Sequence, residues 1–202
     1  MKVFWITAAF GKSGNYVYRD IVPVRDKRTE PWEFDGTLKS GRWNAAIPAV
    51  RLMGGRRKRV ADFLACTPGS AFAMVDLIGT DVARILHDCG EILPIASPIE
   101  LPVSIVNIAP SVDALDVEMS EWRRYGDVTP YMELCKPAFD PARLPARSVF
   151  KIRENGWRIF ASQGAVPASD DFKAAYEKQG LKGLEFHEVW NDDGDPVEIP
   201  EW

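Results

Sequence analysis

The sequence predicts an α+β fold, in which a mostly antiparallel sheet has two amphipathic helices packed on it. Short apolar stretches with a period of two residues, typical of half-buried strands, recur along the chain. Two segments, 80–90 and 169–180, instead repeat their apolar residues every three or four positions, as a helix with one buried face does. Hydrophobic residues make up 46% of the 202 residues, which is enough for a sizeable core.

The N-terminal region is expected to be rich in strands, the first at 3–8 and the next at 16–24. The Gly-Lys-Ser run at 11–13 is similar to the end of a phosphate-binding loop. That loop also needs a glycine where this chain has Ile6, and a helix where this chain has its second strand. We therefore interpret the run as a turn between strands.

A strand–helix–strand unit is predicted for residues 71–95. Its first strand leads to Thr80, a residue type whose hydroxyl caps the first turn of a helix. The apolar face of the helix consists of Val82, Ile85, Leu86 and Cys89. Gly90 is expected to end the helix. The other elements expected in this region are strands at 92–95, 103–108 and 132–135, and a short polar stretch at 120–125.

The stretch 149–190 gives the clearest pattern, and it predicts a hairpin, a helix and a strand in succession. Apolar residues at 150 and 152 alternate with Lys151 and Arg153, the pattern of a half-buried strand with basic residues on its other face. The Asn-Gly pair at 155–156 predicts a tight hairpin turn, because a type I′ turn needs positive φ at both central residues.

Ser169 is expected to cap the helix that follows, since its hydroxyl can accept a backbone N–H. The buried face of this helix is predicted to consist mainly of Phe172, Ala175 and Tyr176, with Gly180 closing the helix. In the last strand two sets of residues alternate, Leu184, Phe186 and Glu188 with Glu185, His187 and Val189.

Several of these runs together are similar to runs of a known family. They are Val-Asp-Ala-Leu-Asp at 112–116, Leu-Pro-Ala-Arg-Ser-Val-Phe-Lys-Ile at 144–152, Ile-Phe-Ala-Ser at 159–162, Ser-Asp-Asp-Phe-Lys-Ala-Ala-Tyr at 169–176 and Gly-Leu-Lys-Gly-Leu-Glu-Phe at 180–186. The family they resemble is immunity-protein family eleven of bacterial polymorphic toxin systems, formerly a domain of unknown function. The resemblance covers roughly the last 140 residues. It implies a protein that binds a cognate toxin stoichiometrically and blocks it without turnover.

Bulk composition bears on partners and compartment. The formal net charge of −4 disfavours nucleic acid as the main partner and suits a basic protein. Three widely spaced cysteines without a Cys-x-x-Cys pair indicate a reducing cytoplasm rather than a disulfide framework. No apolar run reaches the roughly 18 residues of a membrane span, so no membrane partner is expected. Most of the seven tryptophans are expected in the core, and the sequence does not indicate an oligomeric state.

The sequence offers no clear catalytic, cofactor or metal site. Its two histidines, His87 and His187, lack the spacings of metal-ligand motifs. One hypothesis pairs Cys89 as nucleophile with His187 as base, although buried cysteine usually behaves as a small hydrophobe. The alternative to an immunity protein is an enzyme of unrecognised type, hydrolase-like, using His187 and a carboxylate. A third hypothesis, nucleic-acid binding through the basic cluster at 56–59, is disfavoured because that cluster lacks stacking aromatics.

We predict a single domain over residues 1–202, with a strand-rich N-terminal elaboration at 1–60, a family-like region at 61–190 and an acidic tail at 191–202. The tail has five carboxylates and no basic residue. Its simpler interpretation is a frayed, solvated terminus, but its carboxylates would attract a basic toxin cleft and raise the association rate. The predicted toxin-binding residues are Trp190, Asp192, Asp193, Asp195, Glu198 and Trp202.

Overall fold

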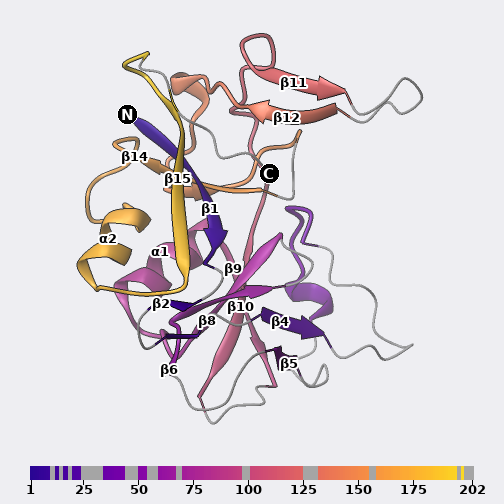
Figure 1. Cartoon of the computed structure of the whole chain (residues 1–202), viewed down its shortest axis with the longest axis vertical. Helices are drawn as coiled ribbons and strands as arrows, with labels where there is room; N and C mark the ends of the chain where they lie inside the picture. The colour runs from indigo at the N-terminus through magenta and orange to yellow at the C-terminus, as the bar shows by residue number, and fades with distance from the viewer. Residues whose placement is uncertain are drawn as a thin grey trace.

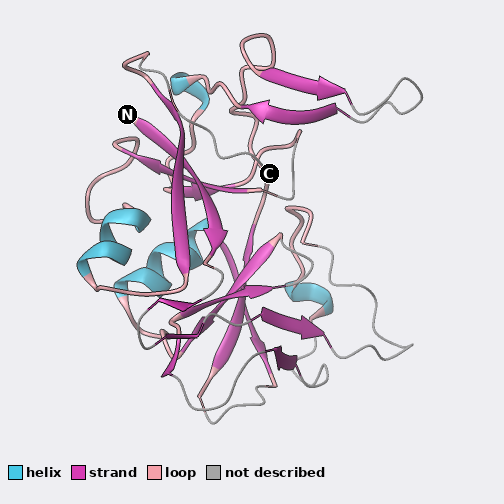
Figure 2. Cartoon of the chain, in the orientation of Figure 1, coloured by secondary structure: helices cyan, strands magenta, loops and turns pink. Residues whose placement is uncertain are grey.

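The computed structural model describes residues 1–9, 12–13, 16–17, 20–23, 34–43, 50–53, 59–66, 70–96, 101–124, 132–154, 158–194 and 197. Over these residues the chain has an α+β fold, with mostly antiparallel sheets and two α-helices packed on them, as the sequence predicts (Figures 1 and 2). Neither of the two α-helices in the described ranges is long and apolar enough to cross a membrane.

The strands are β1 (Lys2–Ala8), β2 (Lys12–Ser13), β3 (Tyr16–Val17), β4 (Asp20–Pro23), β5 (Val50–Met53), β6 (Arg59–Val60), β7 (Phe63–Cys66), β8 (Ala71–Val75), β9 (Gly90–Ile95), β10 (Val103–Ile108), β11 (Glu121–Arg124), β12 (Met132–Lys136), β13 (Val149–Phe150), β14 (Ile159–Gln163) and β15 (Leu184–Asn191). The α-helices are α1 (Asp81–Cys89) and α2 (Phe172–Lys178), and the 3-10 helices are η1 (Ser40–Arg42) and η2 (Pro141–Arg143).

Two larger sheets have the strand orders β13-β14-β1-β15 and β5-β4-β7-β8-β10-β9, beside the smaller sheets β11-β12 and β2-β3-β6. In the first sheet β1 lies between β14 and β15 and is antiparallel to both. Strands β14 and β15 are therefore parallel, and α2 connects them. The second sheet repeats this arrangement, since β10 lies between β8 and β9, which α1 connects. The boundary between the predicted N-terminal elaboration at 1–60 and the family-like region at 61–190 stays a prediction. Strand β1 belongs to the first of these ranges, but it lies in one sheet with β13, β14 and β15 of the second.

Three apolar clusters form the core. The largest joins both sheets and both helices, and α2 contributes Phe172 and Tyr176 to it as the sequence predicts. The second lies on the other face of the six-stranded sheet, and the third on the other face of the four-stranded sheet. Four tryptophans are half-buried against the second and third clusters, Trp43 against the former and Trp5, Trp122 and Trp190 against the latter.

Local capping chemistry sets the ends of the first helix. The hydroxyl of Thr80 accepts a hydrogen bond from the N–H of Ala83 at 3.2 Å, and α1 ends before Gly90, so both predictions are confirmed. Lys12 and Ser13 pair with β3 as a strand, so no helix starts at the Gly-Lys-Ser run. The Asn-Gly turn at 155–156 and residues 54–58 of the basic region lie outside the described residues.

The predicted N-cap of the second helix is wrong. The N-cap of α2 is Asp171 rather than Ser169, because the Asp171 carboxylate accepts the N–H of Ala174 at 2.9 Å. Ser169 lies instead in a turn that the hydrogen bond from Asp170 N–H to Pro167 C=O closes. The polar stretch at 120–125, for which the sequence predicts no element, contains strand β11, which pairs with β12.

Candidate functional site

The predicted binding residues that the structure describes lie together at the end of β15, beside the N-terminus (Figure 1). The ring of Trp190 is half-buried and meets Phe139 edge-on, with ring centroids 6.0 Å apart. Asp192 and Asp193 follow it and are exposed. Asp195, Glu198 and Trp202 lie outside the described residues. One aromatic side chain and two carboxylates of the predicted set are therefore neighbours.

Positive groups from the start of β1 pair with carboxylates of β15. The Asp192 carboxylate accepts a hydrogen bond from the ammonium of Met1, which lowers the pKa of Asp192. Lys2 donates to Glu188 at 2.7 Å, and this hydrogen bond lowers the pKa of Glu188. Both carboxylates therefore stay ionised at neutral pH, and Asp193 adds a further negative charge beside them.

Strand β15 is an edge strand, with β1 as its one strand neighbour in the described sheet. The N–H of Ala9 donates to the C=O of Gly183, so this opposed pair is hydrogen-bonded. In an antiparallel ladder the residues of one strand turn their backbone groups alternately toward and away from the neighbour. Glu185 and His187 therefore point theirs at β1, whereas Leu184, Phe186 and Glu188 point theirs outward.

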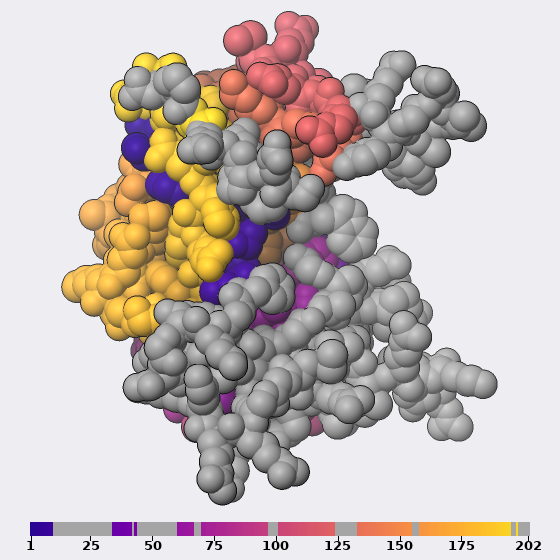
Figure 3. Space-filling model, in the orientation of Figure 1, coloured from indigo at the N-terminus to yellow at the C-terminus, as the bar shows by residue number. Residues whose placement is uncertain are grey.

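The start of this outer edge is closed by a side chain of α2. The hydroxyl of Tyr176 accepts the N–H of Leu184 at 3.0 Å and donates to its C=O at 3.2 Å. For the outward backbone groups of Phe186 and Glu188, the described residues supply no such partner. A β-bulge follows, where the register shifts between Val3 and Phe4. The open part of the edge before the bulge is therefore Phe186 to Glu188. Strand β15 (yellow) lies on the visible face of the molecule (Figure 3).

The proposed histidine–carboxylate chemistry centres on His187 in the same strand. Its Nε2 lies 3.0 Å from Thr7 Oγ1 and 3.6 Å from Glu185 Oε2. A relay from hydroxyl to carboxylate needs one partner on each ring nitrogen. Both of these contacts are made by Nε2, which brings the Thr7 hydroxyl and the Glu185 carboxylate to the same ring nitrogen.

Cys89, the nucleophile of the hypothetical Cys89–His187 pair, is buried in the largest core cluster. Burial raises the pKa of its thiol to about 11, so the reactive thiolate is scarce at neutral pH. This supports its interpretation as a small hydrophobic residue. Within the described ranges, no three His, Cys, Asp or Glu side chains gather as metal ligands would.

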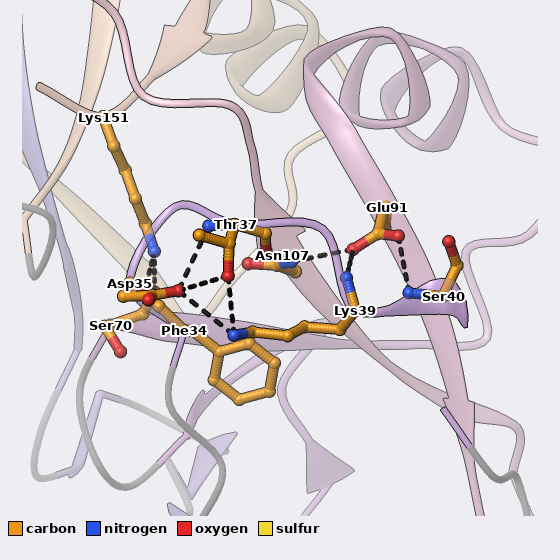
Figure 4. Close-up of polar contacts among 9 residues, drawn as sticks. All are labelled: Phe34, Asp35, Thr37, Lys39, Ser40, Ser70, Glu91, Asn107 and Lys151. Carbon is orange, nitrogen blue, oxygen red and sulfur yellow. Dashed lines mark hydrogen bonds and ion pairs between the residues drawn. The ribbon is translucent and has the colours of Figure 1, made fainter. Parts of the chain in front are cut away.

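A cluster of polar contacts holds segment 34–43 on the second sheet (Figure 4). At one end of it is Lys151, predicted on the basic face of a half-buried strand but fully buried in the structure. Its ammonium donates to the C=O of Phe34 and, at 2.6 Å, to the C=O of Ser70. Both faces of this stretch are buried, since Val149 lies in the largest core cluster and Phe150 and Ile152 in the third, so Lys151 has no solvent-facing side. Burial lowers the pKa of Lys151 to about 8.

Glu91 fixes the other end of that segment. Its carboxylate accepts the N–H groups of Lys39 at 2.6 Å and Ser40 at 2.8 Å, at the start of η1. Asn107 donates from Nδ2 to Glu91 and to the C=O of Thr37, both at 2.9 Å. Burial opposes ionisation of Glu91, but these hydrogen bonds outweigh it and lower the pKa. The buried Oδ1 of Asn107 has no hydrogen-bond partner among the described residues. A polar Asn in the apolar run 103–108 is the sequence signal of this cluster.

Comparison with known proteins leaves the family open. The chain matches no protein-family model, and no curated protein sequence is similar to it. Membership of the immunity-protein family therefore stays a prediction from the sequence runs at 112–116 and 144–186.

Proposed function

We propose that this protein is an immunity protein that binds a cognate bacterial toxin in the cytoplasm and neutralises it by stoichiometric protein–protein interaction. The observation that carries the proposal is the acidic end of edge strand β15, where Trp190 lies beside Asp192 and Asp193. The resemblance of the surrounding sequence runs to immunity family eleven supports the same class.

The chemistry of this surface suits a basic partner. Toxins that act on nucleic acids or other anionic substrates have positive clefts, and carboxylates opposite them speed association. An aromatic anchor such as Trp190, held by packing on Phe139, loses little rotamer freedom on binding. The hydrolase-like alternative would use the contact between His187 Nε2 and Glu185 Oε2 at 3.6 Å.

Co-expression with the neighbouring gene tests the proposal. The gene product beside this one is expressed as a toxin in a sensitive host, with and without this protein. We expect restored growth and one-to-one co-purification. A variant that carries both Trp190→Ala and Asp193→Lys should protect the host less well than the wild-type protein. Failure of the wild-type protein both to restore growth and to co-purify would refute the proposal.

A further inference from the structure

The outer edge of β15 has the properties of a strand-pairing site. On the basis of the proposed function, we infer that the toxin adds an extended, basic segment to this edge, so that backbone hydrogen bonds form at Phe186 and Glu188. This mode supplies affinity through main-chain bonds, while side chains on alternate positions supply specificity.

The backbone geometry is the first argument. Phe186 and Glu188 turn N–H and C=O outward, and the described part of the chain provides these groups with no strand or side-chain partner. At Leu184, the preceding outward residue, the Tyr176 hydroxyl forms hydrogen bonds with both the N–H and the C=O. Proteins usually protect long edge strands with proline, charged side chains or β-bulges. Strand β15 is eight residues long and contains no proline or lysine, so its protection is limited to two glutamates and the β-bulge after Glu188.

The length of the open edge limits the occupant. The Tyr176 hydroxyl closes the edge at Leu184, and the β-bulge after Glu188 interrupts it at the other end. The outward residues between these two points are Phe186 and Glu188, and at about 3.3 Å per residue the stretch 186–188 spans roughly 10 Å. A short partner strand of about three to five residues therefore fits.

Charge selects the partner's chemistry. Glu185 and Glu188 lie on opposite faces of β15, because they occupy positions of opposite parity before the bulge. On one face, a strand added to this edge meets the exposed carboxylate of Glu185, with exposed Asp193 beyond. The Glu188 carboxylate on the other face is already paired with Lys2. A second copy of this chain would bring two sets of the Glu185 and Asp193 carboxylates together, which costs free energy. A segment with lysine or arginine opposite Glu185 and Asp193 is favoured instead.

Amide hydrogen exchange of the full-length protein, alone and with the neighbouring toxin, tests the inference without a substitution. The Phe186 and Glu188 amides should exchange at least about tenfold more slowly in the complex. The Glu185 and His187 amides are internal controls, because they already face β1 and should change little. Fast exchange at Phe186 and Glu188 in a neutralised complex would refute the edge inference and leave the proposed function intact.

A substitution pair gives an independent readout. Glu188→Pro removes an N–H that points away from β1, so the sheet is retained while strand addition is blocked. We expect about 100-fold weaker toxin binding for Glu188→Pro, and at most about tenfold for Glu188→Ala, which keeps the N–H. Equal effects would contradict backbone pairing. Toxin-free dimerisation abolished by Glu188→Pro would identify a second copy as the occupant and overturn the inference. No neutralisation by the wild-type protein would refute the proposed function and the inference with it.

Discussion

Lys151 places an ammonium inside the core, where burial lowers its pKa from 10.5 to about 8. Below pH 8 both folded and unfolded chains hold the proton, and the folded state bears the full cost of burying it. Between pH 8 and pH 10.5 the folded state releases the proton while the unfolded state keeps it. The contribution of Lys151 to stability therefore rises through this window.

The variant Lys151→Met should lack this rise. Relative to wild type, its free energy of unfolding should fall by roughly 3 kcal/mol between the two pKa values. Urea unfolding at several pH values measures the difference, with the exposed Lys182→Met as the matched control. Parallel pH profiles for wild type and Lys151→Met would contradict the assignment.

Tyr176 acts on the edge through one hydroxyl. Tyr176→Phe keeps the ring packing and leaves the N–H and C=O of Leu184 without their recorded partner. We expect a loss of about 1–3 kcal/mol in unfolding free energy. An unchanged urea midpoint would show that the hydroxyl does not contribute to the unfolding free energy. Amide exchange at Leu184 that is no faster than in the wild type would show the same.

At the scale of the element, the N-cap of α2 distinguishes Asp171 from Ser169, which lies two residues before it. Asp171→Ala should destabilise the protein by about 1 kcal/mol, because the first turn loses the acceptor for Ala174 N–H. Ser169→Ala should be nearly neutral, since the C=O of Ser169, which accepts from Arg84, is retained. Thermal unfolding of the pair measures both effects, and a larger loss for Ser169→Ala would reverse the assignment.

The same helix shows what local patterns can and cannot predict. The three- and four-residue spacing correctly predicts α2 and its buried Phe172 and Tyr176, since an amphipathic period needs no knowledge of the rest of the fold. The helical spacing does not predict the N-cap, because Ser169 lies in the turn that follows Pro167 and the helix begins after it. Burial of Lys151 is also beyond a period-two pattern, because its partners Phe34 and Ser70 are distant in the sequence.

For the whole molecule, the prediction concerns the acidic tail, whose deletion should affect toxin binding but not the fold. Deleting residues 192–202 should leave both sheets intact, because β15 ends at Asn191. It should slow toxin association by about tenfold at low ionic strength, since the tail carboxylates are lost. Stopped-flow association kinetics measure this. A deletion of 195–202 keeps the Asp192–Met1 pair and serves as the comparison. Unchanged kinetics in a folded truncation would refute a role for the tail.

The site as a surface was only partly predictable. Composition identified the acid-rich end and Trp190, because charge is visible in the sequence. The open edge of β15 was not predictable, since it depends on which strand occupies the centre of the sheet. That strand is β1, and nothing in its local pattern indicates pairing with both β14 and β15.

This central position of β1 has a consequence for biosynthesis. Ile6 pairs with Ile159 and Lys2 with Asn191, so β1 leaves the ribosome about 150 residues before its strand partners β14 and β15. Until then Phe4 and Ile6, which are buried in the finished sheet, lack the neighbouring strands that help to bury them. Such long-range pairing folds slowly and exposes apolar surface to chaperones and to aggregation. A nascent chain can therefore neither close this sheet nor present the edge of β15 until translation has passed residue 191.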